Sequence, residues 1–232
     1  AFKEQLPTGN LDKASALLPE ASPVALLRIS RLHLQQIVVE GSTPSDLKLG
    51  PGHLRVSPLP GEVGNSVILG RRTTYGAPFA GLPLLKNGDR ISVTTGRGVF
   101  TYVVSATGRS ARTDAGPMLA NANNVLTLVT SDPLLQATDR YWVRAKLSGK
   151  AVAIASRAPA AANPDDLGLT SEFGPLILAV IASQLLVGTG WLAWRYRRHW
   201  PGTVTYLLAA PILVALLLVT FSYFDAMLPG TL

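Results

Sequence analysis

The sequence contains no cysteine and only three histidines, and these shortages limit its chemistry. Without thiols the chain can form no disulfide, no thiolate metal site and no cysteine nucleophile. The histidines His33, His53 and His199 lie too far apart in the sequence to suggest a metal site. We therefore expect neither a metal nor another cofactor.

Charged residues are also scarce, at 15% of the chain, and they are mostly basic. There are 21 Lys and Arg residues against 14 Asp and Glu, which gives a net charge of +7. The basic residues are scattered over the expected strands and loops, without a stripe or a binding motif. This distribution argues against nucleic acid as a partner.

Hydrophobic residues make up 47% of the chain, but they are unevenly distributed. Residues up to about Asp166 are mixed and punctuated by Gly and Pro, whereas the sequence from Gly174 onward is strongly apolar. One β domain that is long enough to bury a core, followed by a membrane segment, fits this pattern better than two domains.

Short β-rich segments bounded by Gly, Pro, Asn or Ser follow one another through residues 24–156. They predict an all-β barrel or sandwich. Residues 46–49 follow a Ser/Thr-rich run that could cap one helical turn. The expected strands are Val24–Ile29, Gln36–Glu40, Ser66–Leu69, Arg90–Thr95, Val99–Ser105, Val125–Thr130, Tyr141–Leu147 and Ala151–Ser156.

The segments on either side of this domain predict linkers and helices. Residues 1–23 contain several breakers and no sustained period, so we expect a linker there. Residues 157–173 begin with a Pro/Ala-rich connector that marks the domain boundary. The chain starts at Ala1 without methionine, so we expect a further segment to precede it.

Two uncharged stretches, residues 174–194 and 203–224, have the length that crosses a bilayer core. The loop between them, residues 195–202, contains three arginines and should face the cytoplasm by the positive-inside bias. We therefore expect a transmembrane hairpin in the plasma membrane, with the β domain and the tail at residues 225–232 outside the cytoplasm.

Small and polar residues inside the first stretch suggest a helix interface. Ala179 and Ser183 have small-xxx-small spacing, and Gln184 is a polar side chain near the middle of the stretch. Such groups usually bury against another helix. That helix is either the second one of the same hairpin or part of a different membrane protein.

Two runs of residues resemble the sortase family. Residues 64–79, GNSVILGRRTTYGAPF, are similar to the class E sortase run GNVVIAGHRTTYGAPF, and residues 127–131, TLVTS, resemble the signature TLxTC with its last residue replaced. The upstream runs VVEGSTPSDLKLGPGH and PLPG also fit the class E pattern. The resemblance covers about residues 26–147, and it implies a closed β-barrel and commonly an N-terminal signal anchor.

The resemblance also implies a catalytic Cys, His and Arg. Ser131 occupies the cysteine position, Arg71 the histidine position, and Arg140 retains the arginine. A serine hydroxyl needs a general base beside it, and Arg71 cannot act as one because a guanidinium stays protonated. We therefore expect a catalytically degenerate member, a pseudosortase, that acts by binding.

Two alternatives stay open. In the first, Ser131 serves an active serine-variant transpeptidase or hydrolase, with His53 as base and Asp132 as its orienting group. Neighbouring strand residues face opposite ways, which weakens the role of Asp132, and His53 could equally be structural. In the second, the chain was engineered at Ser131 and Arg71, although arginine is a poor choice at a histidine position.

The basic residues that the resemblance gathers around Ser131 suggest what could bind. Arg71, Arg72 and Arg140, with Tyr75 and Thr130, would line a groove for an acidic or carboxylate-bearing peptide. Alternatively, the arginines pair with Asp114, Asp132 or Asp139 at the surface. As partners we expect the lipid bilayer and subunits of a cell-envelope membrane complex, in which the chain would be a binding or scaffold subunit.

Overall fold

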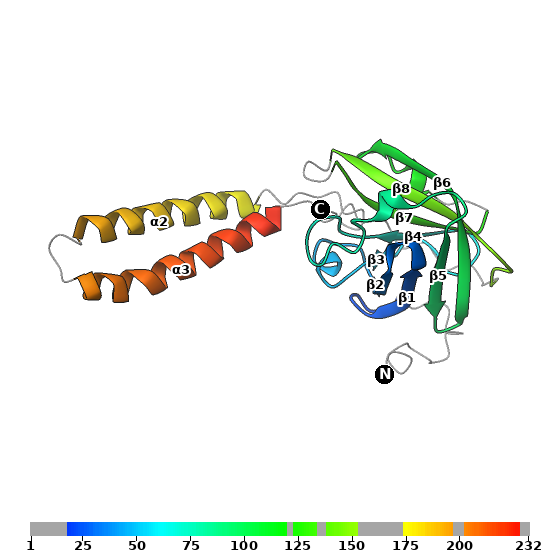
Figure 1. Cartoon of the computed structure of the whole chain (residues 1–232), viewed down its shortest axis with the longest axis horizontal. Coiled ribbons are helices and arrows are strands. Elements are labelled where there is room, and N and C mark those ends of the chain that lie inside the picture. The colour runs from blue at the N-terminus through cyan, green and yellow to red at the C-terminus, as the bar shows by residue number, and fades with distance from the viewer. Residues whose placement is uncertain (1–17, 120–122, 134–137, 153–173, 197–201, 228–232) are drawn as a thin grey trace. The chain divides into compact units, whose positions relative to one another are not determined.

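A computed structural model of the chain describes residues 18–119, 123–133, 138–152, 174–196 and 202–227 (Figure 1). The chain divides into two compact units. The first contains the β-strands and the second contains two helices. Each unit is described by itself.

The strands of the first unit close into a barrel in the order β1-β2-β3-β4-β7-β8-β6-β5, and β5 pairs with β1 to complete it. Pairing is antiparallel except between β2 and β3 and between β4 and β7, which are parallel. The strands are β1 (Pro23–Ile29), β2 (Leu34–Glu40), β3 (Gly52–His53), β4 (Asn65–Leu69), β5 (Arg90–Thr95), β6 (Gly98–Ala111), β7 (Val125–Asp132) and β8 (Asp139–Leu147).

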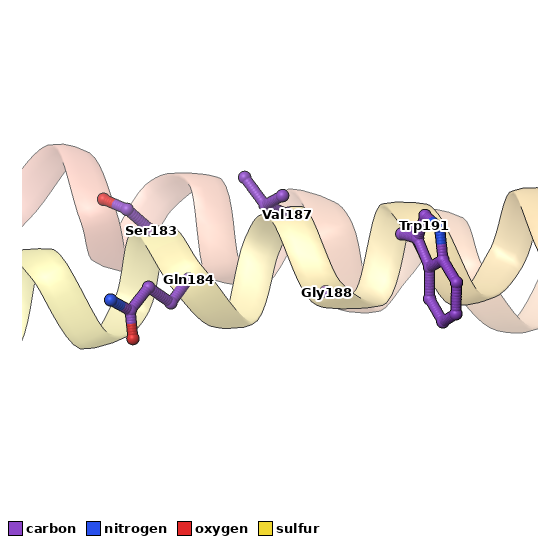
Figure 2. Close-up of a pocket in the computed structure, with 5 residues that line it drawn as sticks. All are labelled: Ser183, Gln184, Val187, Gly188 and Trp191. Carbon is purple, nitrogen blue, oxygen red and sulfur yellow. The ribbon is translucent and has the colours of Figure 1, made fainter.

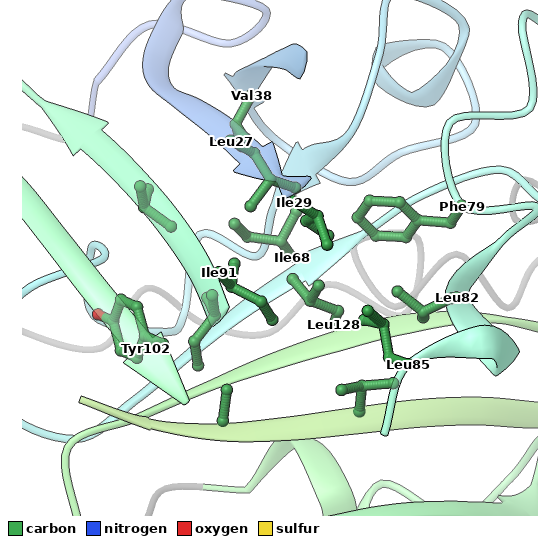
Figure 3. Packing of buried hydrophobic residues seen from close by; sticks show 14 of the residues in the cluster. Leu27, Ile29, Val38, Ile68, Phe79, Leu82, Leu85, Ile91, Tyr102 and Leu128 are labelled. Carbon is green, nitrogen blue, oxygen red and sulfur yellow. The ribbon is translucent and has the colours of Figure 1, made fainter. Parts of the chain in front are cut away.

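The barrel interior is filled by the apolar residues that alternate along these strands. Figure 3 shows Leu27, Ile68, Ile91 and Leu128 meeting from four different strands. All four are fully buried, and each such side chain contributes about 1.5–3 kcal/mol to stability. Tyr102 joins the cluster and accepts a hydrogen bond from the Gly61 N–H, and burial raises its pKa to about 12.

A second buried cluster covers another face of β4 and β7. It contains Leu69 and Val129 from the strands, Leu47 from the short helix η2 (Asp46–Lys48) and Met118 from η4 (Gly116–Met118). Alternate residues of a strand point to opposite faces, so β4 and β7 contribute to both buried clusters. The two short helices therefore lie over the outer ends of β4 and β7.

Seven of the expected strands are confirmed, and η2 confirms the predicted helical turn. The two-residue strand β3 was not predicted, because so short a segment has no periodicity. The eighth expected strand, residues 151–156, lies mostly outside the described residues. Within the part that is described, Val152 forms an isolated bridge with Glu62.

The second unit consists of α2 (Gly174–Tyr196) and α3 (Gly202–Met227), which pack against each other (Figure 2). The helices confirm the prediction of helical segments here, but the prediction that they span a membrane gains no support. Within the described residues, neither helix combines the length and the apolar character needed to cross a bilayer. Ser183, Gln184 and Thr189 place polar groups along α2.

The other parts of that topology were not tested. The arginine-rich segment lies largely outside the described residues, at 197–201. The extracytoplasmic location of the β domain and the lipid partner therefore stay predictions.

Candidate functional site

Ser131 lies near the end of β7, opposite Arg140 of β8. Residues directly opposite each other on neighbouring strands point to the same face of the sheet. Ser131 is 1% exposed and Arg140 is 4% exposed, so both are almost completely buried. By period two, Ser131 shares its face with Val129, which packs in the cluster beneath the two short helices.

Arg71 follows β4 on the same face, and its side chain is 1% exposed. Its Nε donates to the Leu47 carbonyl at 3.2 Å and its Nη2 to the Pro44 carbonyl at 3.0 Å. Its Nη1 donates to Thr74 Oγ1 at 2.9 Å, and the guanidinium lies 4.7 Å from the centre of the Tyr75 ring. Arg71 therefore binds η2, the loop before it and the loop that contains Arg71 itself.

Arg72 points to a different set of acceptors. Its Nη1 donates to the Ser131 carbonyl at 2.7 Å and also pairs with the Asp132 carboxylate. Both members of this ion pair are about nine-tenths buried. The exposed Arg109 of β6 pairs with the second oxygen of the same carboxylate at 2.6 Å. Asp132 therefore neutralises Arg72 from the face opposite to the Ser131 side chain.

Arg140 is held in an apolar setting. Its Nη1 contacts the sulfur of Met118 at 3.4 Å. Burial lowers the pKa of Arg140 to about 10; repulsion by Arg112 lowers it further, and Asp114 acts in the opposite direction. A buried cation beside Ser131 can stabilise negative charge there, but it cannot remove a proton from a hydroxyl.

The structure thus brings Ser131, Arg140 and Arg71 to one face and places Arg72 with Asp132 on the other. Thr130 also faces away from Ser131, and its hydroxyl donates to the Gly70 carbonyl at 2.8 Å. Tyr75 is 44% exposed and stands between Arg71 and Lys48, whose Nζ is 5.3 Å from the ring centre. Of the predicted groove residues, only Tyr75 presents a large exposed surface.

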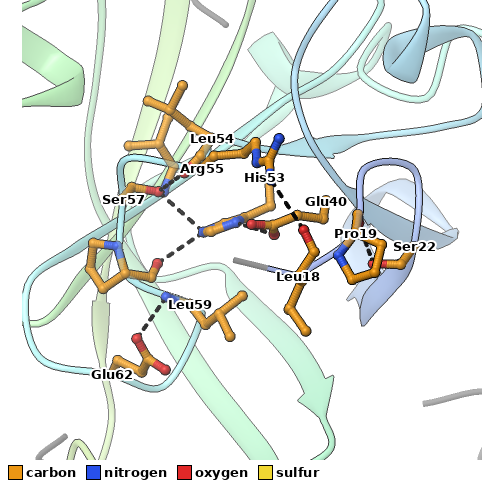
Figure 4. A network of polar contacts seen from close by, with 12 residues as sticks. Leu18, Pro19, Ser22, Glu40, His53, Leu54, Arg55, Ser57, Leu59 and Glu62 are labelled. Carbon is orange, nitrogen blue, oxygen red and sulfur yellow. Dashed lines mark hydrogen bonds and ion pairs between the residues drawn. The ribbon is translucent and has the colours of Figure 1, made fainter. Parts of the chain in front are cut away.

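His53 belongs to a separate buried network, shown in Figure 4. Its Nδ1 lies 2.8 Å from Glu40 Oε2, and its Nε2 lies 3.0 Å from the Pro58 carbonyl and 3.2 Å from Ser57 Oγ. A carbonyl can only accept, so Nε2 carries a hydrogen and cannot serve as a base. The Ser57 hydroxyl donates to the Leu54 carbonyl at 2.7 Å.

This network has the residue types of a catalytic triad but a structural role. Glu40, His53 and Ser57 are at most 6% exposed, and together they connect β2, β3 and the following loop. Sequence reasoning missed Glu40 and Ser57. The contact arises from the parallel pairing of Glu40 with His53, and periodicity does not reveal which strands pair.

In the helical unit, Ala179 and Ala182 are buried, as small residues are where two helices approach closely. The Ser183 hydroxyl donates to the Ala179 carbonyl within α2 at 2.6 Å. Gln184 lies on an open groove of about 480 Å³ with Ser183, Val187, Gly188 and Trp191 (Figure 2). The predicted interface residues thus divide between the inside of the hairpin and this groove.

No cluster of His, Asp and Glu suited to a metal ion occurs within the described residues. The fold is a closed β-barrel in which β4 and β7 are parallel and β8 is antiparallel to β7. Arg71, Ser131 and Arg140 lie at the adjacent ends of these three strands. The sortase-domain family profile matches residues 27–148, just over half of the chain. The chain belongs to the sortase family.

Individual relatives agree with this assignment. The chain is 31% identical over 96 residues to Sortase D of Bacillus subtilis (strain 168). The match covers 41% of this chain and 47% of that protein, so the chain spans about half the length of this relative.

Solved structures of sortases share the barrel. A Clostridium perfringens Sortase D5 transpeptidase is 30% identical, with a TM-score of 0.54 over 57% of this chain and 82% of that one. Sortase E from Streptomyces avermitilis is also 30% identical, with a TM-score of 0.51 over 57% of this chain and 91% of that one. In both cases the structural likeness extends over a little more than half of this chain.

Proposed function

We propose that this sortase-family chain has lost transpeptidase activity and acts as a binding or scaffold subunit of a bacterial cell-envelope protein complex. The observation that carries the proposal is the setting of Arg71. In the position where the family resemblance implies a catalytic histidine, the guanidinium donates to Pro44, Leu47 and Thr74. These contacts hold neighbouring loops in place and supply no proton acceptor.

Ser131 gives no compensating chemistry. A serine hydroxyl needs a base within hydrogen-bond reach, whereas a cysteine is partly ionised near neutral pH. His53 is committed to Glu40 and Pro58, and Arg140 remains a cation at neutral pH. An active serine variant would therefore need a base other than His53 or Arg140.

The catalytic part of the proposal is tested with the purified chain, a peptide carrying a sorting signal and an amine acceptor. Mass spectrometry of the products should show neither hydrolysis nor transpeptidation. Turnover that disappears in Ser131→Ala would overturn the proposal. The double change Ser131→Cys with Arg71→His is the informative comparison, because groups that act as a unit restore activity only together.

The binding part predicts that a partner copurifies from native cells after cross-linking. Tyr75→Ala should reduce its recovery if the barrel makes the contact, because Tyr75 is the exposed aromatic group at the old site. Gln184→Leu should reduce it if the helical groove makes the contact. Unchanged recovery in both variants would exclude both surfaces as the interface.

A further inference from the structure

Arg71 connects the end of β4 to the segment Thr43–Lys48, which includes η2. Two of its three nitrogens bind backbone carbonyls of that segment, those of Pro44 and Leu47. Backbone acceptors keep their position whatever side chains surround them. The buried side chain of Arg71 therefore attaches this segment to the barrel, in addition to the packing of the segment itself.

The attached segment lies on the Ser131 face. Leu47 is fully buried and belongs to the same cluster as Leu69 and Val129, and Ser131 follows Val129 by two residues on β7. Ser131 itself is only 1% exposed. The Thr43–Lys48 segment thus helps to keep solvent from the old nucleophile position.

Hydrogen bonds within the segment also hold its residues together. The Asp46 carboxylate accepts from the Thr43 N–H at 3.1 Å and from the Thr43 hydroxyl at 2.7 Å. The same carboxylate occupies the space where a side chain on Gly41 would stand, and Gly41 has a φ of 107° that favours glycine. None of these local contacts involves Arg71.

The other short helix over this face, η4, binds different residues of the barrel. Asn65 Nδ2 donates to the Pro117 carbonyl at 3.1 Å and to the Leu119 carbonyl at 2.9 Å. Arg144 also donates to the Pro117 carbonyl, at 3.1 Å. With the contact of Arg140 Nη1 to the Met118 sulfur, three side chains from the barrel strands thus bind the η4 side, and none of them is Arg71.

We propose that the Thr43–Lys48 segment is a cover over the Ser131 site and that Arg71 is the latch that keeps it closed. An imidazole has only two ring nitrogens and a shorter reach, so a histidine at position 71 could not bind Pro44, Leu47 and Thr74 together. The substitution that removes the acid–base group thus also seals the site. The latch does not depend on whether a partner binds elsewhere.

The absence of cysteine allows a direct test, because one introduced thiol is then the only one in the chain. In Ser131→Cys, the reaction of the thiol with Ellman's reagent reports how often the site opens. A buried group reacts only through opening, so removing the latch should accelerate the reaction by about tenfold or more. The reaction rate of Ser131→Cys is compared with that of the double variant Ser131→Cys with Arg71→Ala. The absorbance of the product released from Ellman's reagent measures both rates.

Two controls separate a released cover from general loosening of the barrel. Ala145→Cys places the thiol in the core of β8, where Arg71→Ala should leave the rate unchanged. Arg55→Ala removes another largely buried arginine, which donates to the Leu18 carbonyl, and should leave the Ser131→Cys rate unchanged.

Acceleration at both thiol positions, or at neither, would overturn the latch. If Arg71→Ala does not fold, Arg71→Gln replaces it and should accelerate the Ser131→Cys reaction in the same direction. Peptide turnover does not enter this experiment, so its outcome is separate from that of the proposed function.

Discussion

In the account proposed here, the side chain at position 71 determines both the chemistry and the closure of the site. A guanidinium offers several hydrogen-bond donors in a planar arrangement and no acceptor. At this position the donors bind Pro44, Leu47 and Thr74, which replaces proton transfer by loop attachment. The sequence alone indicates that position 71 holds no proton acceptor, because that depends only on the residue type. It did not reveal the acceptors, two of which, Leu47 and Pro44, lie 24 and 27 residues away.

Arg140 illustrates a residue that is retained at a cost to stability. Burial lowers its pKa to about 10, so the charged form is disfavoured in the folded protein. We predict that Arg140→Met raises the free energy of unfolding at pH 7 by roughly 1–3 kcal/mol, because it removes a buried charge and keeps apolar volume. Urea unfolding measures the difference.

The pH dependence of that difference follows from the sign of the shift. Above about pH 10 the folded state has lost the Arg140 proton, while the unfolded state, in which the pKa is higher, still holds it. The contribution of Arg140 to the stability of the unmodified chain therefore becomes more favourable as the pH rises through this range. The advantage of Arg140→Met should shrink there. A variant that is less stable than the parent at pH 7 would show that Arg140 contributes favourable contacts that exceed its desolvation.

At the scale of the elements, the junction after β4 sets the direction of both arginines. Gly70 separates Leu69 from Arg71, and its N–H donates to the Val129 carbonyl at 3.0 Å. A side chain at Gly70 would overlap the ring of Phe79, which is fully buried. The glycine therefore lets the 71–79 loop fold back against the strand, and Phe79 N–H donates to the Arg71 carbonyl at 3.0 Å.

We predict that Gly70→Ala lowers the free energy of unfolding by about 1–3 kcal/mol, because a buried ring must move to admit the methyl group. Chemical denaturation followed by circular dichroism measures the loss. Gly81→Ala is the matched control, since its new methyl group would meet only the flexible end of Leu32 and its φ is −83°. Equal losses in the two variants would contradict this explanation.

The short strand β3 shows why some elements escape prediction. It has two residues, and it exists because Gly52 and His53 pair with β2 on one side and β4 on the other. Its buried network with Glu40 and Ser57 depends on that pairing. Periodicity identifies long strands such as β7, but it contains no information about a residue's neighbour across the sheet.

For the whole molecule, the sequence predicted the class of the barrel correctly. The runs at residues 64–79 and 127–131 carried the family resemblance, and the family match to residues 27–148 agrees with it. The apolar composition after Gly174 predicted helices correctly, but the described parts of α2 and α3 do not meet the requirements for a membrane span. Apolar composition identifies a helix more securely than it identifies the medium around it.

The central claim about the whole molecule is that it keeps the sortase barrel without an activated nucleophile. The most direct measurement is the intact mass of the chain after incubation with a fluorophosphonate, which reacts with serine only when a base activates the hydroxyl. We predict no adduct, because Arg71 offers no proton acceptor and His53 is engaged by Glu40 and Pro58. A single adduct that maps to Ser131 and disappears in Ser131→Ala would contradict the account.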